Sequence, residues 1–255
     1  MVSLSKCGSS ILTTIYPDWP APDNIKAIST SRQGGFSLPP YDALNLGEHV
    51  GDDINTVNKN RELLLIQAEL PEPPRWLKQV HGTTVSLASN WQQGDEADAI
   101  ITDHINQVCP IMTADCLPLL LCNQQGDMVA AIHAGWRGLA AGIIEKTLTQ
   151  FNCPSQQIMA WLGPAIGPTK FEVGTDVFAE FTAQSRHAHL AFQQTDSNHY
   201  LADIYLLAKQ RLKASGVSDI YGGEHCTVSD STRFFSYRRD GITGRMASMI
   251  WIAPK

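Results

Sequence analysis

The chain has 255 residues, enough for one large domain or two small ones with a substantial core. Its net charge of −6 and its lack of a Lys/Arg-rich tract argue against a nucleic-acid-binding surface. No apolar run approaches the roughly 20 residues needed to span a bilayer, so we expect neither nucleic acid nor membrane among the partners.

The cysteines and the start of the chain bear on its location. The first twenty residues lack the basic start and long apolar stretch of a signal peptide, and no apolar run before Cys7 indicates a lipoprotein site. The cysteines are Cys7, Cys109, Cys116, Cys122, Cys153 and Cys226, without a CxxC pair. This scatter favours reduced thiols and a cytoplasmic location.

Short runs of apolar and β-branched residues predict strands along most of the chain. In chain order, these runs cover residues 25–30, 75–80, 83–88, 97–103, 108–113, 117–122, 128–132 and 245–253. A loop rich in Gly and Pro, over residues 32–47, follows the first of them.

Helices are predicted where apolar residues recur at steps of three and four. The first covers residues 54–68, with Asp52 or Asp53 as its N-cap. Two more cover 139–151 and 203–215, the latter ended by Gly216.

About four helices thus mix with short strands, without regular βαβ alternation. This pattern predicts an α+β fold with mixed or antiparallel sheets. No repeat, low-complexity segment or linker divides the chain, so we expect a single domain over residues 1–255.

A thiol, a carboxylic acid and an imidazole lie at the ends of two runs of residues that are predicted to form strands. Asp115 and Cys116 precede the run 117–122, and His133 follows the run 128–132. An antiparallel hairpin centred between residues 124 and 125 would place Cys116 nearly opposite His133, with Cβ atoms about 4.5–5.5 Å apart. That separation suits a shared metal ion or a thiol–imidazole hydrogen bond. His81, in a polar turn between two predicted strands, is by itself weaker evidence for a site.

Six motifs run in order from about residue 30 to residue 251: KQVHG, DAIITD, TADCLPLLL, IHAGWRGLAAGI, GPAIGP..FEVG and FFSYRRDG.TGRMAS. Together they resemble the YfiH-type family, also called the multicopper polyphenol oxidase, laccase-domain or purine nucleoside phosphorylase family. The resemblance implies a layered α/β/β/α architecture with mixed sheets, similar to cysteine hydrolases of the cytotoxic-necrotizing-factor type. It also implies a metal site formed by His81, Cys116 and His133. Thr169 and Lys170 stand where relatives often carry cysteines, so an accessory role of those cysteines is not expected here.

The donor set bears on which metal is bound. Two imidazoles and a thiolate suit Zn²⁺, and three protein ligands leave a fourth position for water, whose pKa the ion can lower to about 7. Copper is the alternative, in a blue-copper arrangement with Met112 as a weak axial ligand. A laccase cluster needs several His-x-His pairs, and the sequence holds one, His187 and His189.

The resemblance implies a purine nucleoside enzyme: phosphorolysis of adenosine, inosine and methylthioadenosine, and deamination of adenosine. In deamination, an activated water attacks C6 of adenine, and Asp115 is the nearest candidate for moving protons. Phosphorolysis needs cations for phosphate, and the candidates are Arg61, Arg137, Arg238 and Arg239. We expect a pocket lined by AGWRG, the 32–47 loop and FFSYRRDG.

Three alternatives remain open. The first is an amidase that uses Cys116 as nucleophile, His133 as base and the AGWRG amides as oxyanion donors. The resemblance also links the family with amide hydrolysis on a cytoplasmic peptidoglycan precursor. A zinc site could perform that hydrolysis without a covalent step. A copper-dependent polyphenol oxidase is the second. A non-enzymatic zinc-binding protein is the third, although structural zinc sites usually have four ligands.

Overall fold

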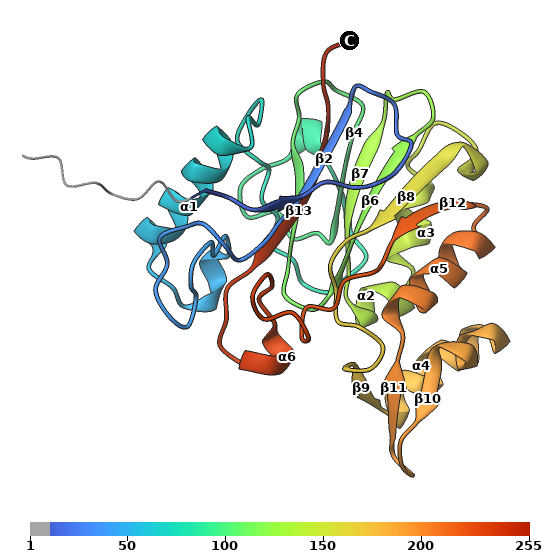
Figure 1. Cartoon of the computed structure of the whole chain (residues 1–255). Coiled ribbons are helices and arrows are strands. Elements are labelled where there is room, and N and C mark those ends of the chain that lie inside the picture. Colours follow the sequence, from blue (N-terminus) through green and yellow to red (C-terminus); the bar gives the residue numbers. More distant parts are fainter. Residues whose placement is uncertain (1–10) are drawn as a thin grey trace, which may run out of the picture.

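The structure is a computed structural model that describes residues 11–255 (Figure 1). Two large β-sheets lie face to face at its centre. The first contains β3 (Val85–Leu87), β4 (Ala99–Thr102), β6 (Leu117–Asn123), β7 (Val129–Ala134), β8 (Ile158–Leu162) and β12 (Asp219–Gly222), in the order β12-β8-β6-β7-β4-β3. The second contains β1 (Thr14–Ile15), β2 (Ile25–Thr30), β5 (Cys109–Thr113) and β13 (Met246–Ile252), in the order β1-β2-β13-β5. Cys7 lies outside the described residues.

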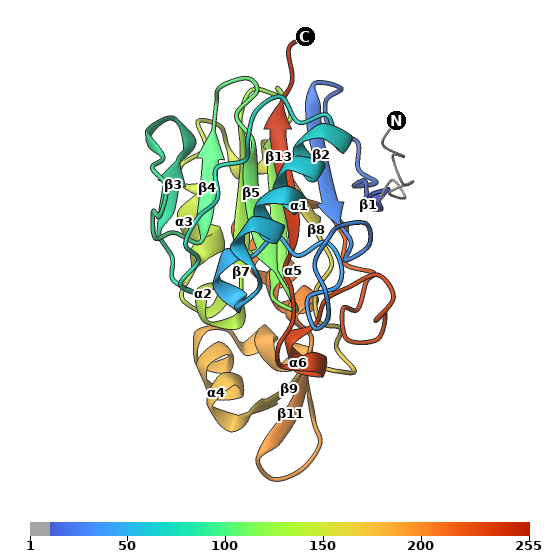
Figure 2. The same cartoon turned by 90° about the vertical axis from the view of Figure 1, so that its left-hand side faces the viewer.

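Helices cover the outer faces of both sheets (Figures 1 and 2). They are α1 (Ile54–Gln67), α2 (Trp136–Ala140), α3 (Ile143–Leu148), α4 (Thr175–Gln184), α5 (Ile204–Ala214) and α6 (Tyr237–Asp240), with 3₁₀ turns η1 (Glu48–Val50), η2 (Ala88–Asn90), η3 (Ser155–Gln157) and η4 (Arg186–Ala191). A third sheet, of β9 (Glu172–Gly174), β10 (Phe192–Gln194) and β11 (His199–Ala202), packs with α4 at one end of the molecule. No helix within residues 11–255 is long and apolar enough to cross a membrane.

The alternation of side chains along β6 explains the layers. Leu120 and Cys122 point toward the second sheet and join its core, whereas Leu119 and Leu121 point the other way, into the core with α3 and α5. Leu64 of α1 packs in a separate core on the far face of the second sheet. The order is therefore helix, sheet, sheet, helix, the predicted α/β/β/α arrangement. The first sheet is mixed, because its pairs β12–β8 and β3–β4 are parallel and its other pairs are antiparallel, whereas the second sheet is antiparallel throughout.

Two helix predictions hold because their caps are local. Asp53 caps α1 by accepting a hydrogen bond from the Thr56 N–H at 2.8 Å. Asp203 caps α5 in the same way, through the N–H of Leu206. The single helix predicted over 139–151 is wrong: helical structure begins earlier, at the first residue of α2, and Gly142 with φ +92° separates α2 from α3.

The strand predicted over 75–80 is also wrong. The structure has only an isolated bridge there, between Lys78 and Glu96. The backbone N–H groups of Val80, His81 and Gly82 donate instead to the buried carboxylate of Asp98. Because a side chain takes these donors, the segment turns rather than pairing with a strand. Strands β1 and β8 to β12 and helices α4 and α6 were not predicted.

Candidate metal centre

The hairpin of β6 and β7 forms as predicted, but its register is different. Pro118 pairs with His133, so the centre lies between residues 125 and 126 and Cys116 is not directly opposite His133. The turn sets this register: the Asn123 side-chain oxygen accepts the N–H groups of residues 127 and 128, and Gly126 adopts φ +70°. Cys116 instead lies just before β6, after Asp115 has turned the chain at φ +92°.

The three predicted donors nevertheless converge. The donor atoms of His81, Cys116 and His133 all lie within 4.8 Å of one another. Cys116 Sγ is 3.8 Å from His81 Nε2, and the two imidazole rings meet edge to face with centroids 4.7 Å apart. His133 is buried, Cys116 is half-buried and His81 is exposed, so the cluster is open on one side.

The surroundings of the cluster fit a metal ion. A Cβ atom on Gly135 would lie 2.9 Å from His81 Cδ2 and 3.2 Å from Cys116 Sγ, so the backbone passes the cluster where no side chain fits. Two imidazoles and one thiolate are a donor set that suits Zn²⁺ or copper. Within residues 11–255 this is the single group of three such donors.

Asp98 organises the cluster, and sequence reasoning missed it. Its fully buried Oδ1 accepts from His133 Nδ1 at 2.7 Å, which leaves Nε2 of His133 to face the other donors. The same carboxylate holds the backbone of the His81 loop. The available signal was an acid just before the apolar strand AIIT, a position where an unpaired charge is costly.

The charges within the cluster are coupled. Burial alone would raise the pKa of the Cys116 thiol, but the His133 charge and hydrogen bonds from His133 and His81 lower it to about 6. Burial would lower the pKa of His133, yet the Cys116 charge and the hydrogen bond to Asp98 raise it to about 9. At neutral pH the metal-free cluster is therefore a thiolate–imidazolium pair.

These shifts predict how metal-free protein reacts with iodoacetamide. Because the thiolate is the nucleophile, we expect labelling of Cys116 to rise with pH through about 6 and to level off near neutrality. Cys109 and Cys122 are internal controls, since burial raises the pKa of each to about 12. Mass spectrometry of the labelled peptides measures all three rates. A Cys116 rate that still climbs above pH 8 would contradict the pair.

The three donors border a cleft with two compartments. One, of about 380 Å³, is lined by His49, Met112, Tyr237 and Arg245, and the other, of about 290 Å³, by Trp136, Arg137, Phe171 and Arg238, among others. Residues of the AGWRG and FFSYRRDG motifs line the cleft, as predicted. The 32–47 loop does not line the cleft; it braces Arg245, whose N–H donates to Asn45 Oδ1 at 2.9 Å.

The other predicted site residues separate into two groups. Arg137 and Arg238 line the cleft, whereas Arg239 is turned away, bonded to Asp240 and to carbonyls of its own loop. The carboxylate of Asp115 accepts from the hydroxyls of Thr227 and Ser236 and from the N–H of Arg238. Asp115 thus fixes α6 beside the cleft.

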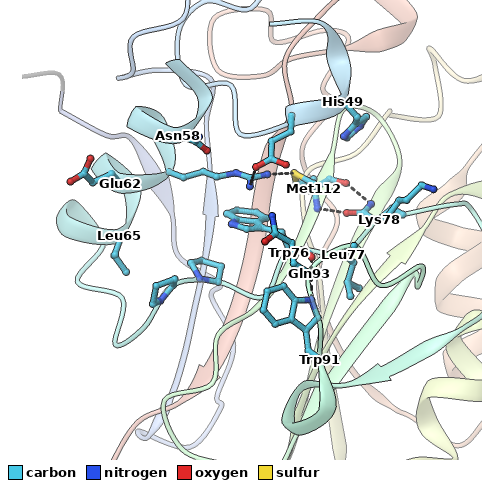
Figure 3. Close-up of a pocket in the computed structure, with 16 residues that line it drawn as sticks. His49, Asn58, Glu62, Leu65, Trp76, Leu77, Lys78, Trp91, Gln93 and Met112 are labelled. Carbon is cyan, nitrogen blue, oxygen red and sulfur yellow. Dashed lines mark hydrogen bonds and ion pairs between the residues drawn. The ribbon is translucent and has the colours of Figure 1, made fainter. Parts of the chain in front are cut away.

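Arg61 lies in a neighbouring groove of about 790 Å³ between α1 and the loops before β3 and β4. It pairs with Glu48 and stacks on Trp76, 4.4 Å from the ring centroid. Figure 3 shows Trp76 near the centre of the side chains that line this groove, Trp91 below it, and His49 and Met112, which also line the cleft, above it. The Met112 sulfur contacts Arg61 Nη2 at 4.0 Å.

Fold and site together define a layered α+β protein with an open His-Cys-His metal site beside a cleft that holds arginines. The family model described as multi-copper polyphenol oxidoreductase laccase matches residues 26–253. The chain belongs to this family, the YfiH-type family.

Its relatives are similar over nearly their whole length. The purine nucleoside phosphorylase YfiH of Escherichia coli is 52% identical over 239 residues, covering 93% of this chain and 98% of the relative. A purine nucleoside phosphorylase of Haemophilus influenzae is 49% identical over 242 residues, covering 94% and 99%. Relatives with this name support an enzyme.

Two crystal structures share the fold. Protein NMB0706 of Neisseria meningitidis superposes with a TM-score of 0.91 at 48% identity, covering 94% of this chain and 99% of that chain. YlmD from Geobacillus stearothermophilus reaches 0.86 at 30% identity, covering 95% and 100%.

Proposed function

We propose that the protein is a zinc-dependent purine nucleoside phosphorylase that cleaves adenosine, inosine and methylthioadenosine with phosphate and also deaminates adenosine. The observation that carries the proposal is the convergence of His81, Cys116 and His133 beside a cleft, in a chain whose relatives are named purine nucleoside phosphorylases. In phosphorolysis a phosphate oxygen bonds to C1′ of the ribose while the C1′–N bond breaks and the base leaves with a proton. The products are the free base and ribose 1-phosphate.

His81, Cys116 and His133 would hold the ion, which supplies Lewis acidity toward a water or substrate oxygen when bound. Asp98 keeps His133 in one tautomer by accepting from Nδ1. Asp115 has its oxygens occupied by hydroxyl and amide donors, so we assign it a positioning role for α6 in place of proton transfer.

A cysteine amidase is a second candidate, because Cys116 and His133 form a thiolate–imidazolium pair of the kind that activates a nucleophile. Its substrate class would be an amide such as that of a peptidoglycan precursor. Copper-dependent phenol oxidation has less support, since the Met112 sulfur expected as axial ligand contacts Arg61.

Metal analysis and a product screen test the proposal together. We expect purified protein to hold about one zinc ion per chain and to convert inosine to hypoxanthine and ribose 1-phosphate only when phosphate is present. Removing the metal with a chelator should abolish turnover, and adding zinc should restore it. Full turnover of inosine by metal-free protein would contradict the zinc dependence and favour a mechanism in which Cys116 and His133 act without a metal ion.

A further inference from the structure

The arginines of this chain differ in whether a carboxylate neutralises them. Those with a carboxylate partner are Arg32, Arg61, Arg75, Arg211, Arg233 and Arg239. Within residues 11–255, Arg137, Arg186, Arg238 and Arg245 have no such partner, and all of these except Arg186 line the cleft beside the metal cluster. In a chain with a net charge of −6, this concentrates positive charge at one place.

The described residues that line the cleft include one carboxylate against these three arginines. Asp115 is the single acid among the described residues that line either compartment, and its oxygens already accept three hydrogen bonds. A cationic cleft of this kind recruits anionic ligands.

Arg245 is the most enclosed of the three. It is half-buried, whereas Arg137 and Arg238 are exposed. Arg245 Nη1 donates to the carbonyls of Thr243 and Gly244, each at 3.0 Å, while Nε and Nη2 have no acceptor among the described residues. A guanidinium with two free donors on one edge can bind a planar pair of oxygens.

The backbone around Arg245 holds its side chain in place. A Cβ atom on Gly47 would lie 2.8 Å from Arg245 Cγ, so the side chain lies against a position where only glycine leaves room. The Leu46 N–H donates to the Arg245 carbonyl at 3.1 Å, and Asn45 accepts the Arg245 N–H. The guanidinium is therefore positioned before any ligand arrives, which reduces the entropy lost on binding.

We propose that Arg245 binds inorganic phosphate in the compartment that it shares with Cys116 and His133, which makes it the phosphate subsite. The assignment rests on the proposed phosphorolysis for its use, but the binding itself does not depend on nucleoside. Arg137 and Arg238 line the second compartment, and Tyr237 lines both compartments. These two arginines add positive charge to the cleft but do not form the phosphate subsite.

Isothermal titration of inorganic phosphate into the purified protein, without nucleoside, tests the subsite. Loss of a charge-assisted hydrogen-bond pair in Arg245→Met should weaken phosphate binding about 10- to 100-fold. Arg186→Met is the matched control, because Arg186 also lacks an ion pair and lies in η4, away from the cleft; its phosphate affinity should equal that of the wild type. If Arg245→Met fails to fold, Arg245→Lys should fold and show a smaller loss, because a lysine keeps the charge but not the fork.

The outcomes separate this proposal from the proposed function. Phosphate binding that depends on Arg245, in a protein without phosphorolysis, would support the subsite and refute the phosphorylase. Phosphorolysis by Arg245→Met with an unchanged KM for phosphate would support the phosphorylase and refute the subsite. A second titration uses adenosine 5′-monophosphate as the probe. Arg245-dependent binding of this ester without binding of inorganic phosphate would overturn the assignment. A wild-type protein that binds neither compound would also overturn it.

Discussion

Replacing Cys116 with serine is expected to lower zinc affinity more than about 100-fold, beyond what loss of an outer hydrogen-bond partner costs. A neutral hydroxyl is a much poorer ligand than a thiolate, and the Cys116 thiol is deprotonated near neutral pH. The substitution changes one atom at a half-buried position, so the fold should persist. Competition with a chromogenic chelator measures the affinity, and Cys153→Ser, also half-buried and outside the cleft, is the matched control.

The same variant separates the two enzyme mechanisms. If the thiolate only holds the ion, excess zinc should recover part of the turnover of inosine by Cys116→Ser, because His81 and His133 remain in place. If Cys116 is a covalent nucleophile, zinc cannot rescue the serine variant, and an alkylating substrate analogue should label wild-type Cys116 stoichiometrically. Turnover of a nucleoside and of an amide substrate, measured against zinc concentration, decides between the phosphorylase and the amidase.

Replacing Asp98 with asparagine is expected to be the most destabilising change near the site. The Asp98 carboxylate accepts from His133 Nδ1 and from three backbone N–H groups in a fully buried position. In asparagine, one carboxylate oxygen is replaced by an NH2 group, which cannot accept from the backbone N–H groups that now surround it. The negative charge beside His133 is lost as well. We expect the free energy of unfolding to fall by about 3–5 kcal/mol and zinc affinity to fall about 10- to 100-fold.

Asp103→Asn is the control for Asp98→Asn, because Asp103 lies in the same motif but is exposed and, among residues 11–255, forms an ion pair with His104 alone. Its effect on unfolding should stay within about 0.5 kcal/mol. Urea denaturation of the metal-free proteins isolates stability from metal binding. An Asp98→Asn protein as stable as Asp103→Asn, with unchanged zinc affinity, would show that Asp98 does not organise the cluster.

The arginines show how much of the site could be predicted. The sequence does not distinguish the four arginines predicted as phosphate ligands, because all four carry the same charge. In the structure, Arg61 is neutralised by Glu48 and Arg239 by Asp240. Arg245 was not a candidate, because its lack of a carboxylate partner is a property of the folded chain. The Arg61–Glu48 pair joins residues of separate segments and so depends on the fold, whereas Arg239 and Asp240 are neighbours in the sequence.

The sequence by itself determined the donor residues and the elements whose signals are local. The motifs identify His81, Cys116 and His133, and helical periodicity with a capping aspartate predicts α1 and α5. Only the tertiary structure decided how these parts meet. The Asn123 turn shifted the hairpin register, and Asp98, which lies just before β4, ordered the His81 loop where a strand was predicted. Both effects arise from side chains that satisfy backbone N–H groups, and hydrophobic periodicity carries no information about such bonds.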